Sequence, residues 1–131
     1  TDMHSPPIPI SLGELLDKIT ILQIKLENLT SQDALNNVVR ELKQLQSIFL
    51  KFCPDAIKPK QLELELKKIN QQLWDIEDKI REKEKHKSFD DEFIQLARSV
   101  YITNDERSHI KRRINETFGS DLIEEKSYAD Y

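Results

Sequence analysis

Glycine is nearly missing from this chain of 131 residues, since Gly13 and Gly119 are the only two. Tight turns need residues that tolerate positive φ, and glycine does so without strain. A fold with many such turns, above all an all-β sandwich, is therefore disfavoured. We expect a few long elements instead, and the length fits one domain with a real core.

Cysteine and long apolar runs are also scarce. Cys53 stands alone, so it has no partner in the chain for a disulfide. No apolar run approaches the ~20 residues of a membrane span, and no basic and then apolar leader opens the sequence. Twenty Lys and Arg against 24 Asp and Glu give a net charge of −4, which attracts neither nucleic acid nor an anionic membrane. We expect a soluble, cytoplasmic protein that binds neither.

What the sequence does contain is four stretches in which large apolar residues recur every three or four positions, as in packed helices. They run from Leu12 to Leu29, from Leu35 to Phe52, from Leu62 to Ile80 and from Phe93 to Ile114. Ser11-Leu12-Gly13-Glu14 predicts a capping box at the start of the first helix, with Ile10 and Leu15 as its hydrophobic staple. This helix should end near Thr30.

The later boundaries follow from polar residues and prolines between these stretches. Ser31 to Asp33 forms a polar break, Cys53-Pro54-Asp55 ends the second helix, and Pro59 suits the first turn of the third. Ser88 with Asp91 is expected to cap the fourth helix. Gly119 should end that helix in the left-handed conformation.

Short connections between four helices favour antiparallel neighbours, so we predict an all-α, antiparallel up-and-down four-helix bundle with two longer C-terminal helices. Residues 1–10, rich in proline, are expected to form an extended arm, residues 11–119 the bundle, and residues 120–131 a short tail with one helical turn at 121–125. The longer helices should overhang at residues 80–95. We expect a homodimer that covers the apolar side chains there, which are Phe89, Phe93 and Ile94.

Four segments carry a resemblance to a known family. They are ISLGELLDKITILQIKLE at residues 10–27, LWDIEDKIR at 73–81, VYITNDERSHIKRRIN at 100–115 and SDLIEEKSY at 120–128. Through these segments nearly the whole chain from Ile10 resembles a family of bacterial proteins classed as a domain of unknown function. The resemblance implies a small helical domain, and it supplies no activity and no catalytic residues.

Two pairs of carboxylates stand three residues apart, Glu14 with Asp17 and Asp75 with Asp78, as in helical hydrolases that hold Mg²⁺ between facing helices. If neighbouring helices run antiparallel along a common axis, Asp17 is level with Leu66, about 14 Å along the axis from Asp75. One metal ion cannot bridge that gap, so we interpret these carboxylates as solvated residues or partners of nearby lysines. The three histidines are scattered and offer no zinc spacing. We expect neither a metal nor a cofactor.

Two further classes are disfavoured. A chorismate-mutase-like bundle needs several cations converging on a dicarboxylate, but the first arginine is Arg40, and Lys18 and Lys25 replace it only in part. The basic runs at residues 79–87 and 111–113 lack interleaved aromatic residues, which argues against nucleic-acid binding.

The best candidate site is a ligand cleft beside the only tryptophan. The same antiparallel register brings Trp74 level with Lys25 and Arg40. It also places Trp74 beside Ile102, because facing residues of the third and fourth helices have numbers that add to 176. Thr103 and Arg107 interrupt the apolar stripe of the fourth helix there, and burying either without a partner is costly. We therefore predict a cleft for a small anionic ligand, such as a nucleotide or a sugar phosphate. Its predicted ligand-binding residues are Lys25, Arg40, Trp74, Tyr101, Asn104, Arg107 and Lys111.

Two structural alternatives stay open. In the first, Asp75 or Asp78 pairs with Arg98 or Arg107 in a polar layer, and Trp74 fills the core. In the second, Thr103-Asn104-Asp105-Glu106 is another capping box that splits the fourth helix.

The sequence thus favours a helical binding or interaction module. The alternative is an enzyme that acts on a phosphorylated or carboxylated substrate in the same cleft. Such an enzyme requires Asp75, Asp78, Tyr101 or Lys111 to point into a solvent-connected pocket for proton transfer.

Overall fold

The computed structural model describes residues 5–53, 57–119 and 125–127. Its four helices are α1 (Leu12–Asn28), α2 (Gln32–Phe52), α3 (Ile57–Lys85) and α4 (Asp91–Thr117). No strand occurs in these described residues, so the predicted all-α fold of four helices is confirmed. The helical turn predicted at 121–125 lies mostly outside them, as do residues 1–4 of the arm. No helix in this part of the chain is long and apolar enough to cross a membrane.

Side chains cap three of the helices at their N-termini. Ser11 accepts a hydrogen bond from the amide of Glu14 at 3.0 Å, as the capping box predicts. Ser31 caps α2 in the same way, through the amide of Ala34 at 3.4 Å. The cap of α4 is Asp90, whose carboxylate accepts from the amide of Phe93 at 3.0 Å. The prediction that Ser88 caps α4 is therefore wrong.

Ser88 closes the end of α3 instead. Its amide donates to the carbonyl of Lys83 at 2.9 Å, and the amide of Lys87 donates to the carbonyl of Glu84 at 3.1 Å. These two bonds form a Schellman motif, in which the residue after the C-cap, here the second residue beyond α3, takes a positive φ. Lys87 has a φ of 55°, so the turn between α3 and α4 is built without the usual glycine. Gly119 has a φ of 67° just beyond α4, as predicted.

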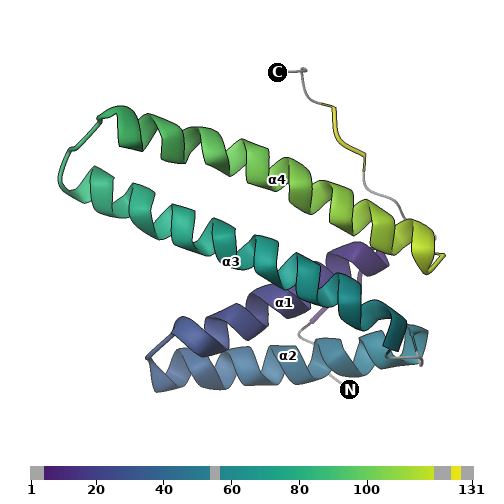
Figure 1. Cartoon of the computed structure of the whole chain (residues 1–131). Helices are drawn as coiled ribbons and strands as arrows, with labels where there is room; N and C mark the ends of the chain where they lie inside the picture. The colour runs from purple at the N-terminus through teal and green to yellow at the C-terminus, as the bar shows by residue number, and fades with distance from the viewer. Residues whose placement is uncertain (1–4, 54–56, 120–124, 128–131) are drawn as a thin grey trace.

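The helices form two hairpins, and α1 lies between α2 and the α3–α4 hairpin (Figure 1). α1 packs against all three other helices, whereas the predicted register placed the second helix beside the third. Full burial of one large apolar side chain stabilises a fold by ~1.5–3 kcal/mol. The core around α1 contains side chains from both hairpins, so its burial holds the two hairpins together. Its members include Leu15, Leu16, Ile19 and Leu22 of α1, Val38, Leu42 and Phe49 of α2, Leu62 and Leu66 of α3, and Ile114 of α4.

The far half of the α3–α4 hairpin lacks such a core. Residues 71–102, which we call the distal arm, contain no buried side chain. Asn70 is the last buried residue of α3, and Thr103 is the first of α4. Figure 1 shows this part of the hairpin extending past α1. The overhang predicted at residues 80–95 is the tip of this arm.

Candidate functional site

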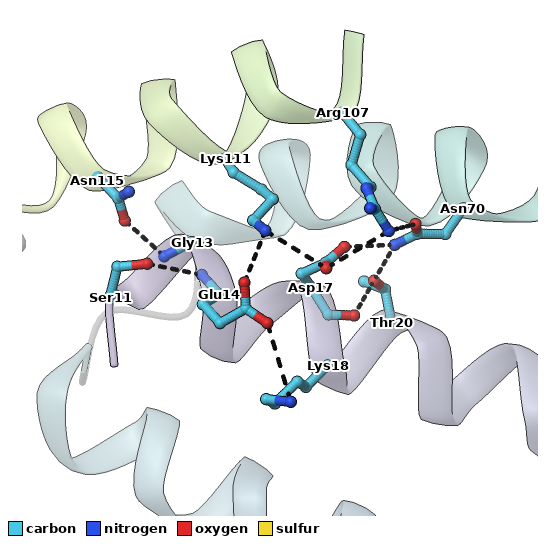
Figure 2. A network of polar contacts seen from close by, with 10 residues as sticks. All are labelled: Ser11, Gly13, Glu14, Asp17, Lys18, Thr20, Asn70, Arg107, Lys111 and Asn115. Carbon is cyan, nitrogen blue, oxygen red and sulfur yellow. Dashed lines mark hydrogen bonds and ion pairs between the residues drawn. The ribbon is translucent and has the colours of Figure 1, made fainter. Parts of the chain in front are cut away.

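A cluster of polar side chains joins the first half of α1 to α3 and α4 (Figure 2). Buried polar groups are costly unless they are paired, so such a cluster must be satisfied internally. We call it the polar clamp. Its members are Glu14, Asp17 and Thr20 of α1, Asn70 of α3, and Arg107, Lys111 and Asn115 of α4, and all but Glu14 and Arg107 are buried.

The backbones of α1 and α4 meet at Gly13. Its amide donates to the side-chain oxygen of Asn115 at 2.7 Å. A β-carbon at position 13 would lie 2.5 Å from the carbonyl oxygen of Lys111, closer than atoms can pack, so the contact requires glycine. The apolar pattern of the sequence did not predict this role for Gly13. One feature of the sequence could have indicated it: a glycine stands within a predicted helix, although helices favour alanine over glycine by about 1 kcal/mol.

The ammonium group of Lys111 lies between two carboxylates. It donates to Glu14 at 2.7 Å and lies 3.7 Å from Asp17. Lys18 approaches the other oxygen of Glu14 at 3.9 Å. The Glu14 carboxylate therefore faces α4, whereas the capping box predicted that it turns back to Ser11. Only 11% of the Lys111 side chain is exposed, which protects its ion pairs from screening by salt.

Asp17 is the more deeply buried carboxylate, with 5% of its side chain exposed. Its Oδ1 accepts from Asn70 Nδ2 at 2.8 Å, and the same nitrogen donates to Thr20 Oγ1 at 2.9 Å. The Thr20 hydroxyl donates in turn to the backbone carbonyl of Asp17 at 2.8 Å. Arg107 Nη1 lies 3.8 Å from Asp17 Oδ2 and 3.5 Å from Asn70 Oδ1. Asp17 thus connects three helices.

The charges of the clamp balance, because two carboxylates face two cations. The interpretation of Glu14 and Asp17 as partners of cations is confirmed. Arg107 is paired inside the protein, as the first structural alternative proposed, but its carboxylate partner is Asp17. α4 is one continuous helix, so the alternative of a second capping box that splits it is wrong.

The predicted register of α3 and α4 is correct. It places two residues side by side when their numbers add to 176. The contacts Lys83–Glu92, Asn70–Arg107 and Glu65–Arg113 add to 175, 177 and 178.

The predicted register of α1 on α3 is wrong. Asp17 was expected beside Leu66, and it contacts Asn70, one turn further along. Ten residues later, Glu27 contacts Lys67, which lies back toward the start of α3. α1 therefore crosses α3, whereas the prediction had the two helices running alongside each other.

The predicted ligand-binding residues occupy different surfaces. Arg107 and Lys111 lie together in the clamp. Trp74 and Asn104 are half-buried, and Tyr101 is exposed on the distal arm. In the other hairpin, Lys25 is half-buried in the last turn of α1, and Arg40 is exposed on α2. Anion binding at these residues stays a prediction.

A shallow groove of about 470 Å³ opens along α3. Gln71 donates to Asp75 there at 3.1 Å, and Lys67 binds Glu27 at 2.5 Å. Of the residues considered for proton transfer, Asp75 lines this groove, whereas Lys111 is engaged in the clamp. The groove is lined by Glu27, Leu64, Lys67, Lys68, Gln71, Gln72 and Asp75.

Ion pairs and an aromatic contact hold the tip of the distal arm. Lys83 Nζ lies 2.9 Å from Asp90 and 3.3 Å from Glu92. The hydrogen bond with Asp90 raises the pKa of Lys83. The same bond, together with the one from the Phe93 amide, lowers the pKa of Asp90. The rings of Phe89 and Phe93 meet edge to face, with their centroids 5.2 Å apart.

Residues 7–131 match the model of a protein family of unknown function, DUF6165. The predicted resemblance to a family of unknown function is thereby confirmed. No curated protein and no solved structure matches the chain.

Proposed function

We propose that this chain, which belongs to the DUF6165 family of unknown function, is a helical interaction module whose binding surface is the distal arm. The family carries no assigned activity, so the proposal rests on the geometry of the molecule. The polar clamp and the core fix the α1–α2 hairpin to the base of α3–α4. The distal arm is left as a two-helix projection.

One observation carries this proposal: the distal arm is rich in apolar side chains and buries none of them. Two helices alone leave an apolar stripe half in water, and helical domains normally cover it with a third element. At the base of the hairpin α1 is that third element. The arm lacks one for its apolar side chains, which are Leu73, Trp74, Ile76, Ile80, Phe89, Phe93, Ile94, Leu96, Val100, Tyr101 and Ile102.

Site-specific cross-linking in cells tests this proposal. A photoreactive amino acid at Lys79 or Ala97, both exposed on the distal arm, should give adducts of discrete mass. The same group at Lys43, exposed on α2, is the matched control and should give none. Trp74→Gln should remove the arm adducts, because it takes away the largest apolar side chain of the surface. Equal labelling at all three positions, or no adduct from the arm, would contradict the proposal.

A second candidate function is the binding of a small anion beside Arg107. Its support is that the Arg107 contacts are long for hydrogen bonds, at 3.5 and 3.8 Å, and that 30% of the side chain is exposed. A phosphate or carboxylate group that reached the exposed part of this guanidinium could accept shorter hydrogen bonds than Asp17 and Asn70 do. Trp74 stands one turn beyond Asn70, and Asn104 one turn before Arg107, so both lie near this position.

Thermal shifts with nucleotides, sugar phosphates and small dicarboxylates test the second candidate. A ligand at 100 times its dissociation constant adds about 2.7 kcal/mol of stability. Arg107→Met should abolish the shift, while Lys68→Met, in the groove on α3, should preserve it. A series of ligands that leaves the melting temperature of the unmodified chain unchanged argues against this site.

A further inference from the structure

The groove along α3 lies beside the last turn of α1. Glu27 of that turn forms part of its lining, and the other six lining residues belong to α3. Figure 1 shows the two helices diverging toward the end of α1. The lining combines an apolar side chain, amides and both signs of charge. Neither proposed function depends on this groove, since the first rests on the apolar residues of the distal arm and the second on Arg107.

The α3 side chains of the groove follow one face of the helix in a fixed order. Lys68 and Asp75 stand seven residues apart, which is close to two full turns, so they lie on the same face. Gln71 and Gln72 lie between them, three and four residues beyond Lys68. Leu64 lies one turn before Lys68. The order along the helix axis is therefore an apolar group, a cation, two amides and a carboxylate.

One cation and one carboxylate of the groove are left without an ion pair. Lys67 and Glu27 neutralise each other between α3 and α1, at 2.5 Å. Among the described residues Lys68 forms no ion pair, and Asp75 accepts a hydrogen bond from the neutral side chain of Gln71 at 3.1 Å. The side chains of Lys68 and Asp75 are both exposed. The groove therefore has a positive end and a negative end, and each can pair with an opposite charge of a ligand.

The distance between these two ends matches a short peptide. Seven residues of α-helix rise about 10.5 Å at 1.5 Å per residue. An extended chain spans at most about 3.3–3.6 Å per residue, so a tripeptide separates its terminal ammonium from its terminal carboxylate by about 10 Å. The side chains of Gln71 and Gln72 carry donors and acceptors for the N–H and C=O groups of the peptide between its ends. The groove volume of about 470 Å³ is within the range of small-molecule sites.

We infer that this groove binds short peptides with free termini, with the peptide ammonium at Asp75 and the peptide carboxylate at Lys68. The side chain of the last peptide residue then lies toward Leu64, which is 52% exposed. An apolar last residue is preferred, because it covers this exposed leucine. A dicarboxylate of the same length places one negative end beside Asp75, so the groove discriminates against it.

Changing the termini of a peptide tests this inference. The probe is alanyl-alanyl-leucine, added up to millimolar concentration to the isotope-labelled full chain. The side-chain amide signals of Gln71 and Gln72 in the NMR spectrum should shift in a saturable way and report the dissociation constant. Acetylating the amino terminus, or amidating the carboxyl terminus, should each weaken binding about threefold or more, the size expected for loss of an exposed ion pair. Replacing the last leucine of the peptide by serine should also weaken binding.

Two variants assign each peptide terminus to its side chain. Asp75→Asn should bind the free and the acetylated peptide equally, and it should still prefer a free carboxylate over an amide. Lys68→Gln should show the opposite pattern. A variant that merely disturbs the structure weakens the binding of all peptides alike, so this exchange of preferences identifies the site. The matched controls are Glu41→Gln and Lys43→Gln, at exposed positions of α2, which should keep both preferences.

Two outcomes would overturn the inference. The first is that the amide signals of Gln71 and Gln72 do not shift, or shift equally with the free peptide and with a peptide capped at both ends. The second is a preference for free termini that survives in both Asp75→Asn and Lys68→Gln, because the charges that recognise the peptide then lie elsewhere. Circular dichroism of each variant confirms that it is folded.

Discussion

The amide of Gly13 in α1 donates a 2.7 Å hydrogen bond to the side chain of Asn115 in α4, 102 residues further along the chain. The first amides of a helix have no partner within the helix. In α1, Ser11 satisfies the amide of Glu14 from within the same segment, and Asn115 satisfies that of Gly13 from another helix. The start of α1 is thus fixed on α4, which explains why α1 begins on that helix and then crosses α3.

Gly13→Ala should destabilise the protein, although alanine is the better helix former. Helix propensity alone predicts a gain of about 1 kcal/mol. The added β-carbon would lie 2.5 Å from the Lys111 carbonyl and 2.9 Å from Asn115, so the two helices must separate. We expect a net loss of about 1–3 kcal/mol, as in overpacked cores. Urea denaturation measures it, and an increased midpoint would show that α1 and α4 lie further apart.

Ser11→Ala should cost about 1 kcal/mol, and Ser31→Ala clearly less. Ser11 is buried and accepts from the Glu14 amide at 3.0 Å. Ser31 is exposed, and its bond to the Ala34 amide is longer, at 3.4 Å, so water replaces it easily. The two variants form a matched pair in the same denaturation experiment. Equal losses would mean that burial of the cap contributes nothing.

The helices and one register were predictable because they depend on local patterns. The apolar spacing gave all four helices, and the short turn between α3 and α4 fixed how those two pair. Ser88 was misassigned because a positive φ was expected only at glycine, and Lys87 adopts it.

The position of α1 was not predictable from the same patterns. The spacing of apolar residues shows which face of a helix is buried but gives no crossing angle. The prediction assumed parallel axes, so it placed Asp17 beside Leu66, one turn from its actual partner Asn70. It correctly required a partner for Arg107, and the wrong register of α1 concealed that this partner is Asp17.

Lys111→Met should destabilise the protein by about 3 kcal/mol, because it leaves the buried Asp17 and the half-buried Glu14 without their shared cation. Arg107→Leu should lower the free energy of unfolding by only about 1 kcal/mol, since the contacts of Arg107 are longer and Asp17 keeps Asn70 and Lys111.

The double variant Glu14→Gln with Lys111→Met should lose less stability than the sum of the two single variants, because Glu14 and Lys111 contact each other directly. Additive losses would show that the two side chains do not interact in solution.

The tip of the distal arm should loosen in acid through Asp90. The hydrogen bond with Lys83 holds the pKa of Asp90 below its ordinary value, so the ionised carboxylate stabilises the fold above about pH 4. That contribution is lost as the pH falls through the depressed pKa of the folded state. Lys83 has a raised pKa and stays charged throughout this range, so the change comes from a carboxylate, and the contribution of Asp90 must be separated from that of Glu92, which also lies 3.3 Å from Lys83. Hydrogen exchange of the amides in the first turn of α4, corrected for intrinsic rates, should become faster below pH 4 relative to exchange of the amides near Ile114.

The control is Asp90→Asn, which keeps a capping oxygen for the Phe93 amide but has no charge to lose. In this variant the ratio of the two exchange rates should not change with pH. The same acid response in both proteins would show that the loosening belongs to another group.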